Sequence, residues 1–567
     1  MDTKQIARKA VESAAVLLKN QDLLPLAPGQ KVAFFGWAQL ETVLSGNGSG
    51  SSRSDREVSI LEACKEAGIA PVAALEEFYR QQIAQRKASQ PSETDPVWLK
   101  EAVNSGLMYE LFGKYTPNPP EFEVPQNLLD QAAQETSVAL WVLGRKSGGE
   151  ECDRHLEDDY YLSAQEKALL EQLCAAFDQV AVVLNCNGLL DLSWVEEYPQ
   201  IKGLLFLGIP GEEGPAALAN LLTGKVSPSG KLSVTVAKHY EDYPVWKDFS
   251  WDKDHPDSIL TYEDYGLTPP EASREFARRP VTVYREDLYL GYRYFDSFGK
   301  QPLYPFGFGL SYTTFSMAAA GVDRGPEGLK LQVAVKNTGS RSGREVAQLY
   351  LSAQGTRSQR AYQELKAFAK TGELAPGQEE TLILTLPWRE LACYREEDSA
   401  WVIEAGTYLL RLGNSSASTQ VVAAVQVEED LVTQQVGCRL AMDPEARKAL
   451  DLLARDPAFV EELPQGCQKF QLSAGDVNPC QVPPVPEVDC SSLSDEELAA
   501  LCVGYGPGIP WAALMDTVLP ATIADEAGTP LTVNDHPEGF DGYVSPAIPE
   551  KGIHSVFYKD GPAGVGE

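Results

Sequence analysis

Residues 137–143 read SVALWVL, an apolar run that starts on its single polar residue. Similar runs lie at 31–37 (KVAFFGW), 180–184 (VAVVL) and 201–207 (IKGLLFL). Continuous rather than alternating apolar character is typical of strands buried on both faces, as in a parallel sheet. Helical patterns separate these runs, and the one at 163–177 has Ser163 with Glu166 three residues later, which predicts a capping box. We therefore expect an open, mostly parallel sheet with helices on both faces, an α/β sandwich.

From residue 313 onwards the apolar pattern changes to period two. Turn residues such as Asn337-Thr338-Gly339 separate the runs. The alternating runs lie at 329–335, 345–352, 380–386 and 407–412. Short alternating strands between turn signals predict a small all-β sandwich of about 100 residues.

The charge balance excludes some partners. The 567 residues include 81 acidic and 48 basic ones, which gives a net charge of −33. Phosphates would be repelled, so we expect neither nucleic acid nor an anionic membrane as a partner. No stretch approaches the ~18–20 apolar residues of a membrane span, and the N-terminus lacks the features of a signal peptide.

The ten cysteines are scattered and none has CxxC spacing. This usage favours reduced thiols in a cytoplasmic protein. Five of them fall between Cys438 and Cys502, which leaves zinc as a weak alternative, because the spacings are irregular and no histidine lies among them. We expect neither a metal nor a cofactor.

The densest group of polar residues follows the run at 137–143. It spans 144–154 and includes three glycines, the adjacent acids Glu150 and Glu151, and the pair Asp153-Arg154. Loops at the carboxyl ends of strands line the ligand crevice of open α/β sheets, so a carboxyl group here is placed for general acid/base work. A solvated loop with a surface ion pair is the alternative.

A Gly-rich stretch lies at 44–52 (LSGNGSGSS). It lacks the Rossmann and Walker spacings, so nucleotide binding has little support. Close approach of its backbone to a polar ligand and a flexible linker both remain open. With five histidines and neither GxSxG nor HExxH, hydrolysis by carboxylates is the chemistry with most support.

The motifs in residues 1–424 resemble, in order, those of glycoside hydrolase family 3, the β-glucosidase group. The opening at 7–26 resembles the first helix of that family's α/β sandwich domain, and 335–352 with 362–378 resembles its fibronectin type III-like domain. The matching blocks between them are LSGNGSGSS (44–52), GGEECDR (148–154), IPGEEG (209–214), LLTGKVSPSGKL (221–232), YLGYRYFD (289–296) and YPFGFGLSYTTF (304–315).

The domain order resembles a reversed arrangement within the family. The family's catalytic (β/α)8 barrel usually comes first, whereas here 492–504 (SLSDEELAALCVG) resembles the opening helix of the barrel and 560–565 (DGPAGV) its first substrate-contacting motif, followed by Gly566 in place of the usual Arg. The resemblance implies an enzyme with its barrel truncated or encoded separately. The expected domains are 1–312 (α/β sandwich), 313–424 (fibronectin type III-like), 425–490 (connecting region) and 491–567 (start of the barrel).

The resemblance also implies the site and the reaction, a retaining hydrolysis of β-glucosides by two carboxyl groups about 5–5.5 Å apart. Glu150 matches the acid/base, Ser49 a hydroxyl that contacts the sugar, and Asp560 a carboxylate that binds sugar hydroxyls. A negative charge on Glu151 would raise the pKa of Glu150. The nucleophile aspartate has no counterpart, so we expect this chain to be inactive without a barrel segment or a partner chain. A non-catalytic carbohydrate-binding or scaffold protein is the alternative.

Overall fold

The computed structural model describes residues 2–46, 58–89, 118–146, 156–246, 284–437, 447–448, 450–455, 460–480 and 490–502, with short pieces between 523 and 558. The chain divides into two units, of which the first comprises Met1–Ser45 and Ser54–Val482 and the second Gly46–Arg53 and Pro483–Glu567. Among the described helices, none has the length and apolar character that crossing a membrane requires.

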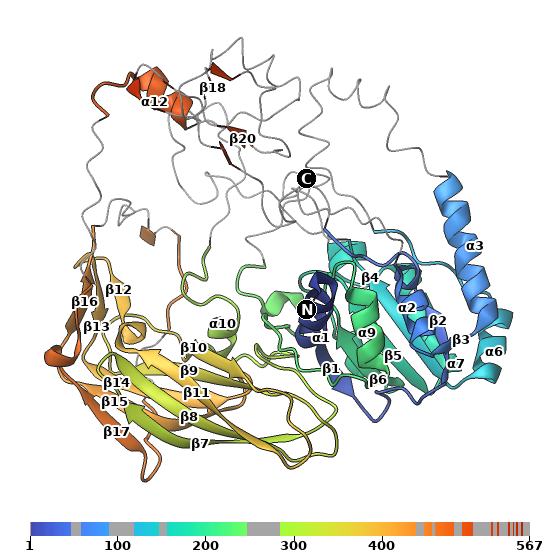
Figure 1. Ribbon diagram of the computed structural model, residues 1–567, viewed down its shortest axis with the longest axis horizontal. Coiled ribbons are helices and arrows are strands. Elements are labelled where there is room, and N and C mark those ends of the chain that lie inside the picture. The colour runs from blue at the N-terminus through green and yellow to red at the C-terminus, as the bar shows by residue number, and fades with distance from the viewer. Residues whose placement is uncertain are drawn as a thin grey trace. The chain divides into compact units, whose positions relative to one another are not determined.

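A six-stranded sheet in the order β1-β6-β5-β4-β2-β3 forms the α/β domain (Figure 1). Its strands are β1 (Val16–Asn20), β2 (Lys31–Phe35), β3 (Ala70–Pro71), β4 (Val138–Gly144), β5 (Gln179–Asn185) and β6 (Ile201–Phe206). The pair of β1 with β6 is antiparallel, and the other pairs are parallel. The open, mostly parallel sheet expected from the sequence is therefore confirmed.

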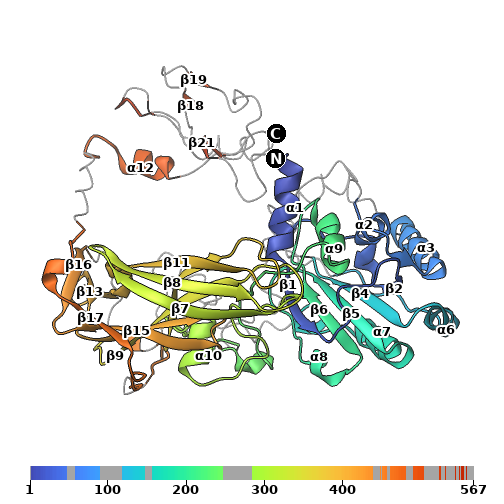
Figure 2. The same ribbon diagram turned by 60° about the horizontal axis from the view of Figure 1, so that its bottom comes forward.

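Helices cover both faces of this sheet (Figure 2). On one face the core includes side chains of α3 (Ala73–Ser89), α6 (Gln126–Glu135), α7 (Ala164–Ala176) and α8 (Trp194–Glu197). On the other it includes side chains of α2 (Ile60–Glu66) and α9 (Gly214–Leu222), and α1 (Thr3–Ala14) lies against α9. Within β4, Trp141 belongs to the first core and Leu140 to the second, which explains why 138–143 is apolar throughout.

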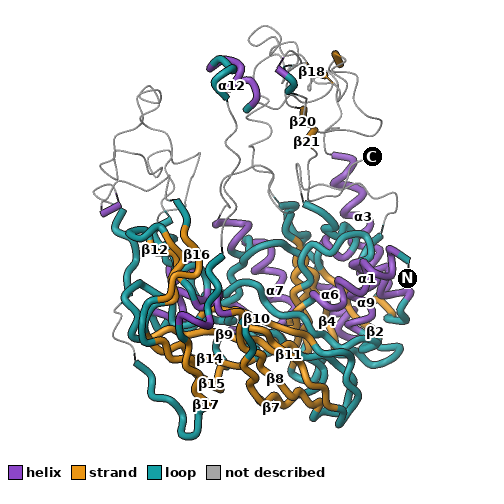
Figure 3. Tube along the Cα trace, turned by 60° about the vertical axis from the view of Figure 1, so that its left-hand side comes forward, coloured by secondary structure: helices purple, strands orange, loops and turns teal. Residues whose placement is uncertain are grey.

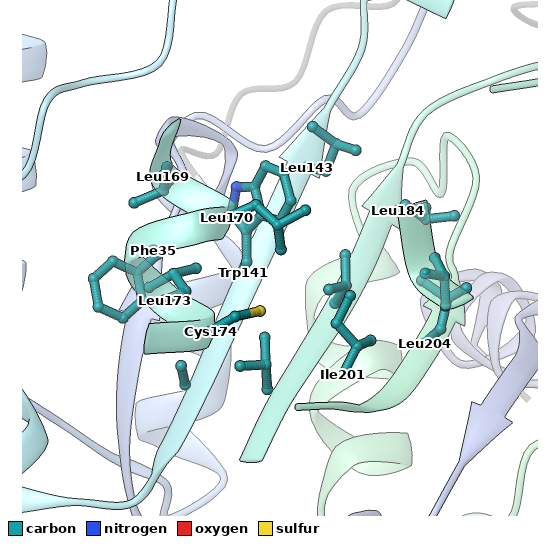
Figure 4. Close-up of a cluster of buried hydrophobic side chains, with 14 of the residues drawn as sticks. Phe35, Trp141, Leu143, Leu169, Leu170, Leu173, Cys174, Leu184, Ile201 and Leu204 are labelled. Atoms are coloured by element: carbon teal, nitrogen blue, oxygen red, sulfur yellow. The ribbon is translucent and has the colours of Figure 1, made fainter. Parts of the chain in front are cut away.

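The position of α7 depends on its predicted capping box. Ser163 Oγ accepts the Glu166 N–H at 3.2 Å, and Glu166 Oε2 accepts the Ser163 N–H at 2.8 Å. From this start the helix presents Leu170 and Leu173 to Trp141 of β4 (Figure 4). Full burial of each such leucine contributes about 1.5–3 kcal/mol, so apolar packing holds α7 on the sheet.

The second domain of this unit is a β-sandwich (Figure 3). One sheet has the order β10-β9-β14-β15-β17, a second β11-β8-β7, and a small third sheet β12-β13-β16. The strands are β7 (Phe315–Arg324), β8 (Gly328–Asn337), β9 (Val346–Gln354), β10 (Glu364–Lys370), β11 (Glu379–Pro387), β12 (Cys393–Arg395), β13 (Ala400–Ile403), β14 (Gly406–Gly413), β15 (Thr419–Val427), β16 (Leu431–Gln435) and β17 (Gln468–Leu472).

This β-domain continues beyond residue 424, where the sequence suggested a connecting region. Strand β15 runs to Val427, and β17 pairs with it in parallel, with Val425 opposite Phe470. The Phe470 side chain belongs to the core of the sandwich. Residues after 424 thus supply a strand to the sheet, and they are not only a connection.

The family-like aromatic strings join the α/β domain to the β-sandwich. Tyr292, in α10 (Tyr292–Ser297), stacks on Phe306 at 4.5 Å between ring centroids. The Gln348 side chain of β9 donates to the Gly307 carbonyl at 3.1 Å. Gly307 has φ +78°, and a Cβ there would lie 2.3 Å from Gln348 Oε1, so both the backbone conformation and the close contact require glycine.

The second unit contains α12 (Asp495–Leu501), capped at its start by Ser494, which accepts the Glu497 N–H at 3.2 Å. This helix lies where the sequence predicted the opening helix of a barrel. The described strands are the antiparallel pairs β18 (Ile523–Ala524) with β19 (Pro530–Leu531) and β20 (Tyr543–Val544) with β21 (Phe557–Tyr558). The barrel start remains a prediction.

Candidate functional site

Two of the three predicted site residues, Ser49 and Glu150, come after strands of the α/β sheet in the chain. Strands β2, β4 and β5 are parallel neighbours, so their carboxyl ends share an edge. Glu150 lies in 147–155, after β4, and Ser49 lies in 47–57, after β2. Both residues, and Asp560, are outside the described residues. The geometry described below is therefore that of the residues next to these two segments in the chain.

Asn185, the last residue of β5, links three chain segments at this edge. Its side chain is fully buried, and it pairs with both polar groups of Val43: Oδ1 accepts the Val43 N–H at 2.8 Å and Nδ2 donates to the Val43 carbonyl at 2.9 Å. The same Nδ2 donates to the Gly208 carbonyl at 2.9 Å. The backbone carbonyl of Asn185 accepts the Arg145 N–H at 3.1 Å. One residue thus holds the origins of the segments that carry Ser49 and Glu150.

A buried ion pair holds the chain on both sides of 147–155. The Arg145 guanidinium is 1% exposed and makes a bidentate contact with Glu166, with N–O distances of 2.5 and 2.8 Å. Its Nε also donates to the backbone carbonyl of Asp159 at 2.8 Å. Asp159 follows the segment 147–155, so Arg145 contacts the chain on both sides of it. Bidentate Arg–carboxylate contacts are among the strong, geometrically specific hydrogen bonds of proteins.

A second polar bridge parallels the first. Asn118 Oδ1 accepts the Lys146 N–H at 2.8 Å, while Asn118 Nδ2 donates to Asp159 Oδ1 at 3.2 Å. At the end of β4, a Cβ on Gly144 would lie 2.6 Å from the Ala38 Cβ, in the 3₁₀ helix Trp37–Gln39. The backbone is therefore closely packed where the segment with Glu150 begins.

Glu121 is a second buried carboxyl group close to the Arg145–Glu166 pair. It is 6% exposed, and its Oε1 accepts the Phe122 N–H at 2.9 Å. Burial raises the pKa of Glu121 to about 7, the hydrogen bond from Phe122 acts in the opposite direction, and the negative charge of Glu166 adds to the rise. Glu121 therefore gains a negative charge near neutral pH, beside a carboxylate that is already paired.

We expect this carboxyl to make stability depend on pH. Because its pKa is raised on folding, its contribution to stability is present below the usual value of 4.5 and is lost as pH rises through about 7. The Glu121→Gln variant cannot ionise there, so the parent should lose about 3 kcal/mol relative to this variant between pH 4.5 and 8. Urea unfolding at several pH values measures the difference.

Glu123→Gln, which changes an exposed carboxyl two residues along the chain, is the matched control. Parallel pH dependences for the parent and Glu121→Gln would show that this prediction is wrong.

Two features of the site were missed in the sequence. Glu166 was predicted only as a capping residue, yet it also neutralises Arg145. Asn185 was not singled out, although it is a polar residue that ends the apolar run VAVVL. That position was a usable signal, whereas nothing in the sequence links Arg145 to a glutamate 21 residues away.

The described residues contain no group of three or more His, Cys, Asp or Glu side chains that could hold a metal ion. The cysteines within the described ranges are free thiols. At this sheet edge the side chains of Asn185, Arg145 and Asn118 are hydrogen-bonded to neighbouring segments, an arrangement that holds loops in place. A carboxyl group on a loop that follows such a strand end can act as an acid or base on a bound ligand.

Comparison with known proteins identifies the family to which this chain belongs. Residues 15–312 match the glycosyl hydrolase family 3 C-terminal domain, and 345–416 match a fibronectin type III-like domain. A β-glucosidase of Ruminococcus albus is 30% identical over 451 residues, which cover 78% of this chain and 43% of that protein. The chain belongs to glycoside hydrolase family 3.

Solved structures agree with this assignment. A β-glucosidase from Paenibacillus barengoltzii matches with a TM-score of 0.65 at 32% identity, over 77% of this chain and 45% of that one. β-Glucosidase 3B of Thermotoga neapolitana, in complex with glucose, matches with a TM-score of 0.63 at 32% identity, over 75% of this chain and 54% of that one. The chain spans about half the length of these relatives.

Proposed function

We propose that this chain supplies the acid/base half of a retaining β-glucosidase site, with Glu150 as the acid/base. The main support comes from the carboxyl edge of the sheet. There Asn185 and the Arg145–Glu166 pair hold the residues that precede the segments with Ser49 and Glu150. Several relatives are β-glucosidases, and one solved relative is in complex with glucose.

In the proposed mechanism, Glu150 first acts as the general acid. It protonates the glycosidic oxygen as the bond to the anomeric carbon breaks, and a carboxylate on the opposite side of the sugar forms the covalent intermediate. Glu150, now ionised, then removes a proton from the water that hydrolyses this intermediate. Ser49 and Asp560 would bind sugar hydroxyls.

The nucleophile aspartate belongs, in this proposal, to a barrel that either continues the chain or is a partner chain. The fit of Glu150 to its role requires a pKa high enough to hold a proton near neutral pH. Glu151 would contribute, because a second negative charge disfavours ionisation.

Reconstitution of the complete site tests this proposal. The chain alone, and the chain mixed with the unmatched portion of the Ruminococcus albus β-glucosidase, would be assayed with an aryl β-glucoside. We expect release of the phenol to require both components. Robust turnover by the chain alone would contradict the half-site assignment.

A non-catalytic carbohydrate-binding or scaffold protein is the second candidate. No turnover in the mixture, together with oligosaccharide binding by the chain, would support it. A cytoplasmic location, proposed from the cysteine usage, would be tested by fractionation of cells that express the chain.

A further inference from the structure

The Asn185 side chain takes the place of a peptide group at the carboxyl edge of the sheet. It offers one acceptor and one donor to the N–H and carbonyl of a single residue, Val43, at 2.8 and 2.9 Å. Because both contacts are made, the orientation of the amide is fixed. Val43 lies beyond the end of β2, so this pair of bonds extends the ladder of hydrogen bonds to a segment that has left the sheet.

Hydrogen bonds link Asn185 and its partner Val43 to two neighbouring segments. Leu44, next to Val43, accepts the Gly211 N–H at 3.0 Å, and Gly208 is bonded directly to Asn185. On the other side, the Asn185 carbonyl holds the Arg145 N–H. The three strand-end segments 43–44, 144–146 and 208–211 therefore meet at one fully buried residue, two of them at its side chain and 144–146 at its backbone carbonyl.

We propose that Asn185 is a positioning residue that keeps the strand-end segments 43–44, 144–146 and 208–211 in register with one another. Its catalytic consequence rests on the proposed function, because the segment that carries Glu150 follows 144–146 in the chain. The hydrogen-bond network itself does not depend on that function. A displacement of about 1 Å of a catalytic group is enough to lower a catalytic rate strongly.

Amide hydrogen exchange on the full chain tests the register. The Asn185→Ala variant removes the partners of Val43 directly, so faster exchange at Val43 is expected for any role. The decisive amides are those of Gly211 and Arg145, whose acceptors are backbone carbonyls that the substitution leaves in place. We expect exchange at both to rise at least about tenfold, the size of a net loss of one hydrogen bond.

Asn337→Ala provides the matched control. Asn337 is also fully buried, and its side chain donates to two carbonyls, those of Arg341 and Leu374, and accepts a backbone N–H from Gly339. It lies in the β-sandwich. A similar loss of stability is expected, without faster exchange at Gly211 or Arg145.

A second variant guards against loss of the fold. Burial against two carbonyl oxygens keeps the carboxyl of Asn185→Asp protonated, so this variant retains the acceptor for the Val43 N–H and one of the two donated bonds. Its exchange rates should therefore fall between those of the parent and Asn185→Ala. Faster exchange confined to Val43, or a uniform rise across both domains, would overturn the proposal.

The catalytic consequence has its own measurement. In the reconstituted mixture, Asn185→Ala should lower kcat at least about tenfold with a smaller change in KM, while Asn337→Ala should leave both unchanged. Unchanged kcat for Asn185→Ala would overturn the positioning role. Absence of turnover in the parent mixture would instead contradict the proposed function, and the exchange data would still decide whether Asn185 couples the segments.

Discussion

Replacing Arg145 by methionine should lower the free energy of unfolding of the α/β domain by about 3–5 kcal/mol, because it leaves the Glu166 carboxylate buried without its cation. The Glu166 carboxylate would keep only the hydrogen bond from the Ser163 N–H. Glu121 lies close enough for its pKa to respond to the charge of Glu166. The loss should therefore be larger at pH 8 than at pH 5, where Glu121 is neutral. Urea unfolding at the two pH values gives both numbers.

Two further variants separate the ion pair from general disruption. The double variant Arg145→Met/Glu166→Gln removes both charges and should recover part of the loss. Glu135→Gln breaks the exposed pair with Lys31, whose atoms are 3.0 Å apart, and should change stability little. Equal effects for Arg145→Met and Glu135→Gln would show that the buried Arg145–Glu166 pair stabilises the fold no more than an exposed pair does.

The second large effect concerns Glu150. In the reconstituted mixture, Glu150→Gln should lower kcat for an alkyl β-glucoside by about 10²–10⁴-fold, because the poor leaving group needs a proton from a general acid. A dinitrophenyl β-glucoside has a good leaving group, so its bond cleavage should be slowed far less. The ratio between the two substrates measures the contribution of acid catalysis separately from binding.

Glu157→Gln is the matched control, an exposed glutamate seven residues after Glu150. It should leave the substrate ratio unchanged. If Glu150→Gln slows the two substrates by the same factor, Glu150 is not the general acid.

The architecture could be predicted largely from apolar patterning. The apolar part of the run SVALWVL lies in β4, where alternate side chains enter two separate hydrophobic cores. The capping box of Ser163 and Glu166 was predictable for a different reason, since it is a local motif that spans three residues. Both signals reflect physics that acts within one element.

The contacts that define the site edge act over longer distances. The contact of Arg145 with Glu166 and that of Asn185 with Val43 join residues 21 and 142 positions apart, and neither has a local sequence signature. The parallel addition of β17 to β15 was missed for the same reason. Glu150, Ser49 and Asp560 were assigned by resemblance, and they remain predictions because they lie outside the described residues.

Rescue of Glu150→Ala by azide tests the central proposal most directly. Azide attacks a glycosyl–enzyme intermediate without needing a general base, so it bypasses the second task of Glu150. With a dinitrophenyl β-glucoside in the reconstituted mixture, we expect slow turnover by Glu150→Ala, acceleration by azide, and formation of β-glucosyl azide. Turnover at the parental rate, or slow turnover that azide leaves unchanged, would contradict the proposal.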